Sequence, residues 1–125
     1  VRGDREQLVQ IFLNLLRNAA QATSRLRLEE RAEILLRTRV ARQCVIQRKR
    51  YKLALNVHVI DNGPGIDEAM KEKIFYPLVT GRDGGTGLGL SIVQTYIEQH
   101  AGSIEVESHP GRTDFSILFP LSHPL

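Results

Sequence analysis

Four glycines lie close together in residues 84–90, directly before a segment with helical periodicity: Gly84, Gly85, Gly87 and Gly89. Backbone N–H groups can approach a ligand closely where side chains are missing, and a helix N-terminus adds partial positive charge. This combination favours phosphate binding; a glycine-rich turn with a purely structural role is the alternative. The segment is not a Walker P-loop, because Leu90 stands where that motif requires lysine. It is not the dinucleotide fingerprint either, because no strand leads into it.

A carboxylate followed at once by a glycine turn is a second candidate for ligand binding. The sequence Asp61-Asn62-Gly63-Pro64-Gly65 ends an apolar run abruptly. A carboxylate at the end of a buried strand could accept a hydrogen bond from an exocyclic amine, which would distinguish adenine from guanine. The alternative is an aspartate that merely closes a turn.

Two asparagines one helical turn apart, Asn14 and Asn18, form a polar stripe beside an apolar helix face. Asparagine is a mediocre helix former, so the pair asks for a reason. Carboxamide oxygens suit a hard cation such as Mg²⁺, which prefers oxygen ligands and keeps several waters. Two polar residues on a solvated flank are the alternative interpretation.

The elements that must position these groups follow from hydrophobic periodicity. Apolar residues at helical spacing predict a helix over residues 4–23, with Asp4 as its N-cap. Strands are expected at 33–40 and 53–60, and residues 41–52 read as a second strand pairing or an extended hairpin arm. A short helix at 67–74 and an irregular loop at 76–86 should follow.

A second long helix is expected from about residue 86 to 100, with Gly102 as its C-terminal stop. Two strands, 103–108 and 113–119, then close the chain. This order predicts an α+β fold, a two-layer α/β sandwich whose mixed, mostly antiparallel sheet carries about three helices on one face. With 125 residues, of which 42% are hydrophobic, the chain suits a single domain spanning 1–125.

Composition narrows the setting of the protein. The apolar runs are too short to span a bilayer, so we expect no membrane contact by this domain. A single cysteine, Cys44, excludes an internal disulfide and a Cys-rich metal site, and it fits a cytoplasmic location. The abrupt opening from Val1 into a helical pattern suggests a fragment of a longer protein.

The net charge is +3, and positive residues concentrate in segment 37–52. A nucleic-acid interface is one interpretation of such a run. Only Tyr51 is available there to stack on bases, and acidic residues are plentiful elsewhere. A solvated or partner-facing hairpin is therefore favoured, and no nucleic-acid partner is expected.

Taken jointly, these segments resemble, in order and spacing, the conserved boxes of the histidine-kinase ATP-binding fold, which gyrase-type and chaperone ATPases share. Residues 14–19 look like the N box, 61–66 like G1, 75–77 like the F box and 85–90 like G2. Residues 113–120 are similar to the closing strand of the family. Finer features resemble the nitrogen-regulatory sensor kinases of the NtrB type, in particular residues 75–82, the basic arm and residues 110–115.

The resemblance implies ATP and Mg²⁺ as cofactors. Asp61 would bind the adenine amine, and Asn18 would ligate Mg²⁺ with Asn14 supporting the metal or the triphosphate. The base pocket would be shaped by Gly63, Gly65 and Thr113. The phosphates would be wrapped by Gly85, Thr86, Gly87, Leu88 and Gly89.

The sequence departs from the family pattern at three places. Gln21-Ala22 replaces a common lysine–aromatic pair, Leu78 replaces the second F-box phenylalanine, and the lid between Pro77 and Gly85 is short. Arg82 is therefore our candidate for the cation beside the phosphates.

By resemblance, the chain is an ATP-binding domain of a protein-histidine kinase. None of its four histidines is followed by Glu or Asp as the acceptor of the family is, so the acceptor should lie on a separate dimerisation segment. The partners implied are that segment, a response regulator and, from the NtrB likeness, a PII-type signalling protein. One alternative is an ATPase or Ser/Thr kinase of the same fold, which would use glutamate at position 14 as general base. Another is a non-catalytic nucleotide-sensing module.

Overall fold

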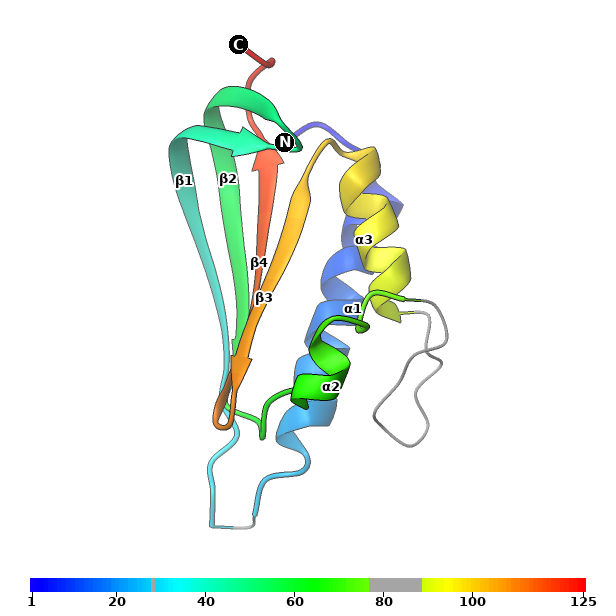
Figure 1. The fold of residues 1–125 in the computed structure, drawn as a ribbon, viewed down its shortest axis with the longest axis vertical. Helices are drawn as coiled ribbons and strands as arrows, with labels where there is room; N and C mark the ends of the chain where they lie inside the picture. The colour runs from blue at the N-terminus through cyan, green and yellow to red at the C-terminus, as the bar shows by residue number, and fades with distance from the viewer. Residues whose placement is uncertain (28, 77–88) are drawn as a thin grey trace.

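A computed structural model describes residues 1–27, 29–76 and 89–125 of the chain. Figure 1 shows a sheet on one side and helices packed against one of its faces. In chain order the described elements are α1 (Arg5–Thr23), β1 (Ile34–Ile46), β2 (Lys49–Asp61), α2 (Glu68–Lys71), α3 (Gly89–Gln99), β3 (Ser103–His109) and β4 (Arg112–Pro120).

The four strands form one sheet in the order β1-β2-β4-β3. Every described strand pair is antiparallel, so the expected mixed sheet is wholly antiparallel within the described residues. The two-layer architecture and the placement of the helices on one face are confirmed (Figure 1). None of the described helices is long and apolar enough to cross a membrane.

Helix α1 begins where the sequence predicts. The side chain of Asp4 accepts a hydrogen bond from the backbone N–H of Gln7 at 3.0 Å, which satisfies one free donor of the first turn. One face of the helix, with Ile11, Leu15 and Ala19, is fully buried against the sheet and α3. This face and the inward residues of β2 and β4 form the main core.

Strands β1 and β2 form a long hairpin, which confirms the extended arm. Gln47 and Arg48 turn the chain with φ angles of 49° and 68°, as a two-residue hairpin turn requires. The arm has a small core of its own, in which Ile46, Tyr51 and Ala54 are buried. The arm is therefore a packed part of the fold.

Helix α3 ends through a mechanism that the sequence misassigned. The residue in the left-handed conformation is Ala101, with φ 59°, whereas Gly102 was expected to be the stop. The N–H of Gly102 donates to the oxygen of Ile97, and that of Ala101 to Glu98. These two bonds make a Schellman cap, with alanine where glycine is usual. Gly102 is required for space, since a Cβ there would lie 2.6 Å from the oxygen of Leu118. The short helix α2 covers only Glu68–Lys71 of the expected 67–74.

Candidate nucleotide-binding site

The carboxylate of Asp61 is held at the end of the central strand β2. Its neighbours in register are Ile34 on β1 and Thr113 on β4, and only 3% of its surface is exposed. One carboxylate oxygen, Oδ1, accepts a hydrogen bond from the backbone N–H of Gly63 at 2.9 Å. The Asp61 side chain makes no other hydrogen bond to the described residues, so Oδ2 has no partner among them.

Burial raises the pKa of Asp61 above its ordinary value, and the hydrogen bond from Gly63 opposes this shift. A buried carboxylate that lacks a cation is costly unless something donates to it. An exocyclic amine of a purine base would be such a donor. The surroundings of Asp61 therefore suit recognition of a base more than the closing of a turn alone.

The turn after Asp61 is fastened to the β3–β4 hairpin. The oxygen of Gly63 accepts from the N–H of Gly111 at 3.1 Å. Gly65 has φ +91°, and a Cβ there would lie 2.6 Å from the oxygen of His109. Glycine is required at position 65 by both its conformation and this close approach.

A pair of hydroxyl groups completes this side of the site. Thr113 is buried, and its Oγ1 lies 2.7 Å from the Oγ of Ser108. The Ser108 hydroxyl also accepts from the backbone N–H of Ile66 at 2.9 Å. Ser108 was missed by sequence reasoning, and only the register, which places it opposite Thr113, could have indicated it.

The asparagine stripe of α1 faces the start of α3. Nδ2 of Asn14 donates to the backbone oxygen of Gly89 at 3.3 Å, so the N-box residue contacts the last glycine of the expected G2 box. Oδ1 of Asn14 accepts from Nε2 of Gln10 at 2.9 Å. The oxygen that was expected to support a metal is thus already engaged, by a residue one helical turn earlier that sequence reasoning missed.

Asn18 lies one turn further along α1 and is half-buried. Ala22 follows it by one more turn, so Asn14, Asn18 and Ala22 share one face of the helix. A Cβ on Gly63 would lie 3.0 Å from the Cβ of Ala22. The turn after Asp61 and the asparagine stripe therefore lie on the same side of α1.

Seven of the expected site residues fall within the described parts of the chain, at positions 14, 18, 61, 63, 65, 89 and 113. Asp61, Gly63, Gly65 and Thr113 gather at one end of the sheet. The other five expected site residues lie outside the described residues: Arg82, Gly85, Thr86, Gly87 and Leu88. No atom of the described residues lies within 4 Å of the position that a Cβ on Gly89 would occupy.

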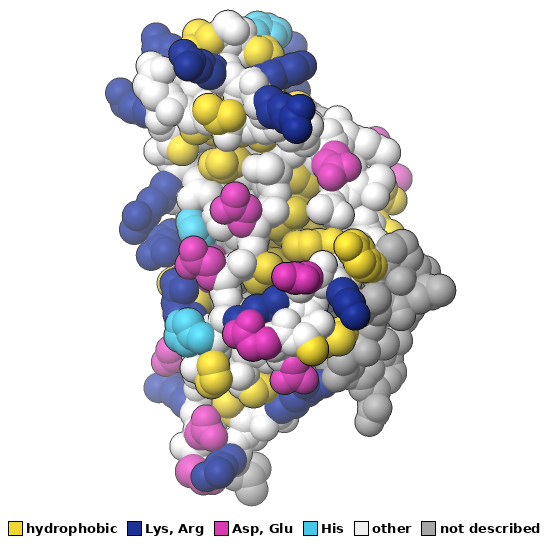
Figure 2. Space-filling view, viewed as in Figure 1, with side chains coloured by type: hydrophobic (Ala, Val, Ile, Leu, Met, Phe, Trp, Pro, Cys, Tyr) yellow, Lys and Arg dark blue, Asp and Glu magenta, His cyan; other side chains and the backbone are white. Residues whose placement is uncertain are grey.

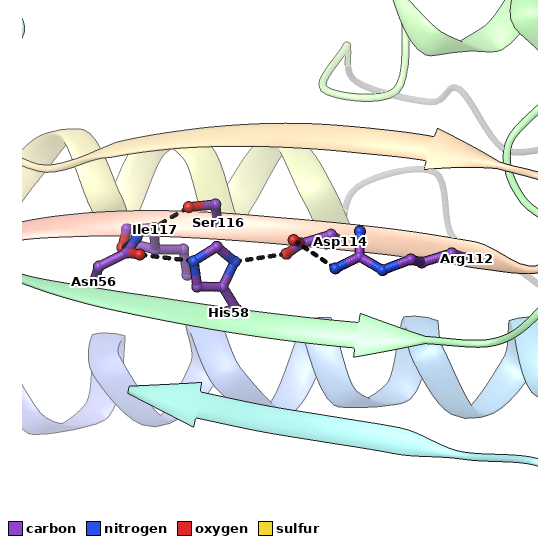
Figure 3. A network of polar contacts seen from close by, with 6 residues as sticks. All are labelled: Asn56, His58, Arg112, Asp114, Ser116 and Ile117. Carbon is purple, nitrogen blue, oxygen red and sulfur yellow. Dashed lines mark hydrogen bonds and ion pairs between the residues drawn. The ribbon is translucent and has the colours of Figure 1, made fainter. Parts of the chain in front are cut away.

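A second polar cluster lies on the opposite, outer face of the sheet (Figure 3). Nδ1 of His58 lies 2.8 Å from Oδ1 of Asp114, whose other oxygen lies 3.4 Å from Arg112. Nε2 of His58 lies 2.6 Å from Oδ1 of Asn56. Nδ2 of Asn56 donates to the backbone oxygen of Ile117, which fixes the orientation of its amide. Both ring nitrogens of His58 therefore face oxygen atoms, and the cluster joins β2 to β4.

This arrangement can be compared with known proteins. The 125-residue chain is 51% identical over 118 residues to the sensory histidine kinase/phosphatase NtrB of Salmonella typhimurium; the match covers 94% of this chain and 33% of the relative. NtrB of Escherichia coli O157:H7 is 49% identical over the same length. The chain thus spans about a third of the length of these curated relatives.

Solved structures of histidine kinases also resemble this chain. The catalytic domain of the histidine kinase ThkA, in a nucleotide-free form, superposes with a TM-score of 0.74 at 34% identity, covering 96% of this chain and 70% of that one. Full-length ShkA in complex with AMPPNP superposes with a TM-score of 0.66 at 27% identity, covering 91% and 21%. The family model described as histidine kinase-, DNA gyrase B- and HSP90-like ATPase matches residues 3–123. The chain therefore belongs to this ATPase family, and its relatives place it among the ATP-binding domains of NtrB-like histidine kinases.

Proposed function

We propose that residues 1–125 form one catalytic domain that binds Mg-ATP and donates its γ-phosphoryl group to a histidine on a separate dimerisation segment. From there the phosphoryl group would pass to an aspartate of a response regulator, in nitrogen-regulatory signalling of the NtrB type. A PII-type protein and a cytoplasmic location remain predictions from the same likeness. The observation that carries the proposal is the buried, singly hydrogen-bonded carboxylate of Asp61 beside a fastened glycine turn.

Adenine recognition is assigned to the end of the sheet. Asp61 accepts a hydrogen bond from the exocyclic amine through Oδ2, and its burial excludes the water that would compete. Gly63 keeps the space beside the carboxylate free of a side chain, since a Cβ there would lie 2.9 Å from Oδ1 of Asp61, and Thr113 lies opposite Asp61 in the register. ShkA was crystallised with AMPPNP, an adenine nucleotide, which supports this choice of ligand class.

The phosphates and the metal are assigned to the asparagine side. Asn18 is assigned to Mg²⁺, as the resemblance implies, while the oxygen of Asn14 accepts a hydrogen bond from Gln10. Asn14 positions the first residue of α3 through its bond to Gly89. We also assign contacts with the phosphates to residues 85–89 and to Arg82. When bound, Mg²⁺ would neutralise phosphate charge, and phosphoryl transfer asks mainly for such neutralisation and for positioning.

The environment of position 14 argues against a hydrolase. An ATPase or Ser/Thr kinase of this fold needs a base at that position, and a carboxamide that donates to Gly89 and accepts from Gln10 cannot take up a proton. A histidine nucleophile needs less help, because its imidazole attacks without first losing a proton when it is neutral.

None of the four histidines is followed by Glu or Asp as the acceptor of the family is, and two of them, His58 and His100, are held in structural contacts. His58 lies between Asp114 and Asn56, and His100 accepts from the N–H of Asp4 while its other nitrogen contacts the oxygen of Tyr96. Both rings are half-buried and engaged in structural contacts. We therefore assign the acceptor to another segment, as the resemblance implies.

Two measurements test the proposal. First, ATP-analogue binding is measured by titration calorimetry with and without Mg²⁺, for the wild-type chain, Asn18→Ala and the control Gln99→Ala, which removes an exposed helical amide. Asn18→Ala should lose most of the Mg²⁺-dependent part of the affinity, whereas the control should keep it.

Second, labelled ATP is supplied with an acceptor-helix fragment, and labelling of the histidine on that fragment is expected. Tight binding without transfer would favour a nucleotide-sensing module, and release of free phosphate without transfer would favour an ATPase.

A further inference from the structure

Strand β1 forms an open edge of the sheet. It is 13 residues long and has β2 as its only neighbour within the described part of the chain. The backbone N–H and C=O groups on its free side can therefore pair with another strand. Edge strands are usually short or covered, so a long open edge raises the question of what it binds.

The helix-facing side of β1 is apolar and uncovered. Leu36 lies opposite Val59, and Val40 lies opposite Leu55, so these side chains continue the surface that α1 covers over β2. Yet 53% of Leu36 and 57% of Val40 is exposed, whereas Val59 is 1% exposed. The apolar face of the sheet thus extends beyond its helical layer.

The opposite side of β1 is basic. Arg37 lies opposite His58 and Arg39 opposite Asn56, which places both arginines on the outer face of the sheet. Figure 2 shows dark-blue side chains along the edge of the molecule that β1 forms and around the arm above it. Nε of Arg37 is buried and has no hydrogen-bond partner in the described residues, although an unpaired buried donor is costly.

The hairpin has almost no internal compensation for its positive charge, because its one acidic residue, Asp61, is the buried last residue of β2. Residues 34–60 contain seven Lys or Arg residues and no Asp or Glu. None of the ion pairs among the described residues involves any of these seven. Like charges on one hairpin repel each other, so this positive surface favours an anionic partner.

We propose that the edge of β1 binds an extended acidic segment of a partner protein, which adds to the sheet as a fifth strand. Alternate side chains of an added strand lie on opposite faces. Its apolar residues would continue the surface of Leu36 and Val40, while its carboxylates would lie beside Arg37 and Arg39. The segment is therefore expected to alternate acidic and apolar residues. This inference uses none of the residues assigned to nucleotide binding and is independent of the proposed kinase activity.

Two other anionic partners fit less well. Nucleic-acid binding by such an arm would need exposed aromatic rings to stack on bases, but its single aromatic residue, Tyr51, is 3% exposed and belongs to the core of the arm. An anionic bilayer could approach only one face at a time, whereas the apolar and basic groups of β1 lie on opposite faces. A strand at the edge matches both faces together.

Defined peptides test the proposal directly. The probes are fluorescein-labelled acetyl-(Glu-Val)₄-amide and acetyl-(Glu-Pro)₄-amide, which carry equal charge. Proline removes every second N–H group and fixes φ at about −65°, which disfavours a paired strand. Acetyl-(Lys-Val)₄-amide reverses the charge. Binding to the 125-residue chain is followed by fluorescence anisotropy. We expect the Glu-Val peptide to bind at least tenfold more tightly than either of the others.

Variants of the chain locate the binding site. Arg37→Glu/Arg39→Glu should weaken the Glu-Val peptide by about a hundredfold, about tenfold for each lost charge pair. The control Arg2→Glu/Arg27→Glu makes the same change of net charge at exposed positions outside the β1–β2 hairpin and should change binding less than twofold. Circular dichroism verifies that each variant is folded.

Hydrogen exchange reports on the strand itself. Amides of residues 34–40 should exchange more slowly when the Glu-Val peptide is bound, and those of the other edge strand, residues 103–109, should not change. Equal binding of the Glu-Val and Glu-Pro peptides, protection at β3, or no detectable binding would overturn the proposal. It would also be overturned if an RNA oligonucleotide or phosphatidylglycerol vesicles bound more tightly than the peptide and lost this binding in Arg37→Glu/Arg39→Glu.

Discussion

Replacing Asp61 with asparagine should change two properties in opposite directions. The carboxylate is 3% exposed and has one hydrogen-bond donor in the described residues, the N–H of Gly63. Its negative charge is therefore poorly compensated until a ligand donates to it. Asp61→Asn should weaken ATP binding and at the same time stabilise the nucleotide-free chain.

The magnitudes follow from these contacts. Loss of a charge-assisted hydrogen bond in a buried pocket costs about 1–3 kcal/mol, which is roughly a 5- to 150-fold loss of ATP affinity. Removal of the buried charge should raise the unfolding free energy of the nucleotide-free chain by about 1 kcal/mol at pH 7. Asparagine keeps the acceptor for the N–H of Gly63, so the turn itself should remain.

The raised pKa of Asp61 also fixes how the unfolding free energy should change with pH. Because burial raises the pKa of Asp61 in the fold, the folded state binds this proton more tightly than the unfolded state, whose reference pKa is 3.8. The unfolding free energy contributed by this group therefore falls as the pH rises from about 3.8 through the raised folded-state pKa, and it stays low above that value. Asp61→Asn should lack this decline.

Urea unfolding at pH 4 and pH 7, together with titration calorimetry of ATP, measures both effects. Asp67→Asn is the matched control, because Asp67 is exposed, lies in the same loop region and caps α2 without a side-chain hydrogen bond. An Asp61→Asn chain that binds ATP like the wild type would remove the base contact from the proposal. A chain that is destabilised at pH 7 would show that Asp61 acts chiefly as a structural acceptor for the turn.

Three further changes test the scaffold of the site, each by urea unfolding. Ala101→Gly should raise the unfolding free energy by about 0.5–1 kcal/mol, since φ 59° strains alanine and not glycine. Gly65→Ala should lower it by about 2 kcal/mol or more, because a Cβ would lie 2.6 Å from a backbone oxygen at φ +91°; unchanged stability would mean that the turn is not fastened as described. Asp114→Ala should cost about 2 kcal/mol by leaving His58 and Arg112 without their acceptor, and Asp114→Asn should cost less.

Local signals gave the elements of the fold. Short stretches of sequence predicted the cap at Asp4, the buried face of α1 and the hairpin arm. The structure confirms all three. The stop of α3 was misassigned because glycine is usual in the left-handed position, whereas here the close approach of Leu118 places the glycine one residue later.

Contacts between distant segments could not be predicted in the same way. The pairing of Ser108 with Thr113 depends on the register of a hairpin, and the bond from Asn14 to Gly89 depends on how two helices pack. The engagement of the Asn14 oxygen by Gln10 is local, but several helical rotamers would satisfy the same spacing. The candidate site residues were predicted from their motif, and their environments could be described only once the fold was known.

The fastening of the turn at residues 63–66 to the β3–β4 hairpin has a consequence for how the chain unfolds. The two segments are more than 40 residues apart, and backbone groups of Gly63 and Ile66 are held by Gly111 and Ser108. The turn cannot keep its shape once β4 separates from β2. Opening of the centre of the sheet therefore destroys this site, so a ligand held there binds only the folded chain. Its binding free energy should then add to the global unfolding free energy in full, and saturating nucleotide should slow the exchange of the most protected amides of β2 and β4.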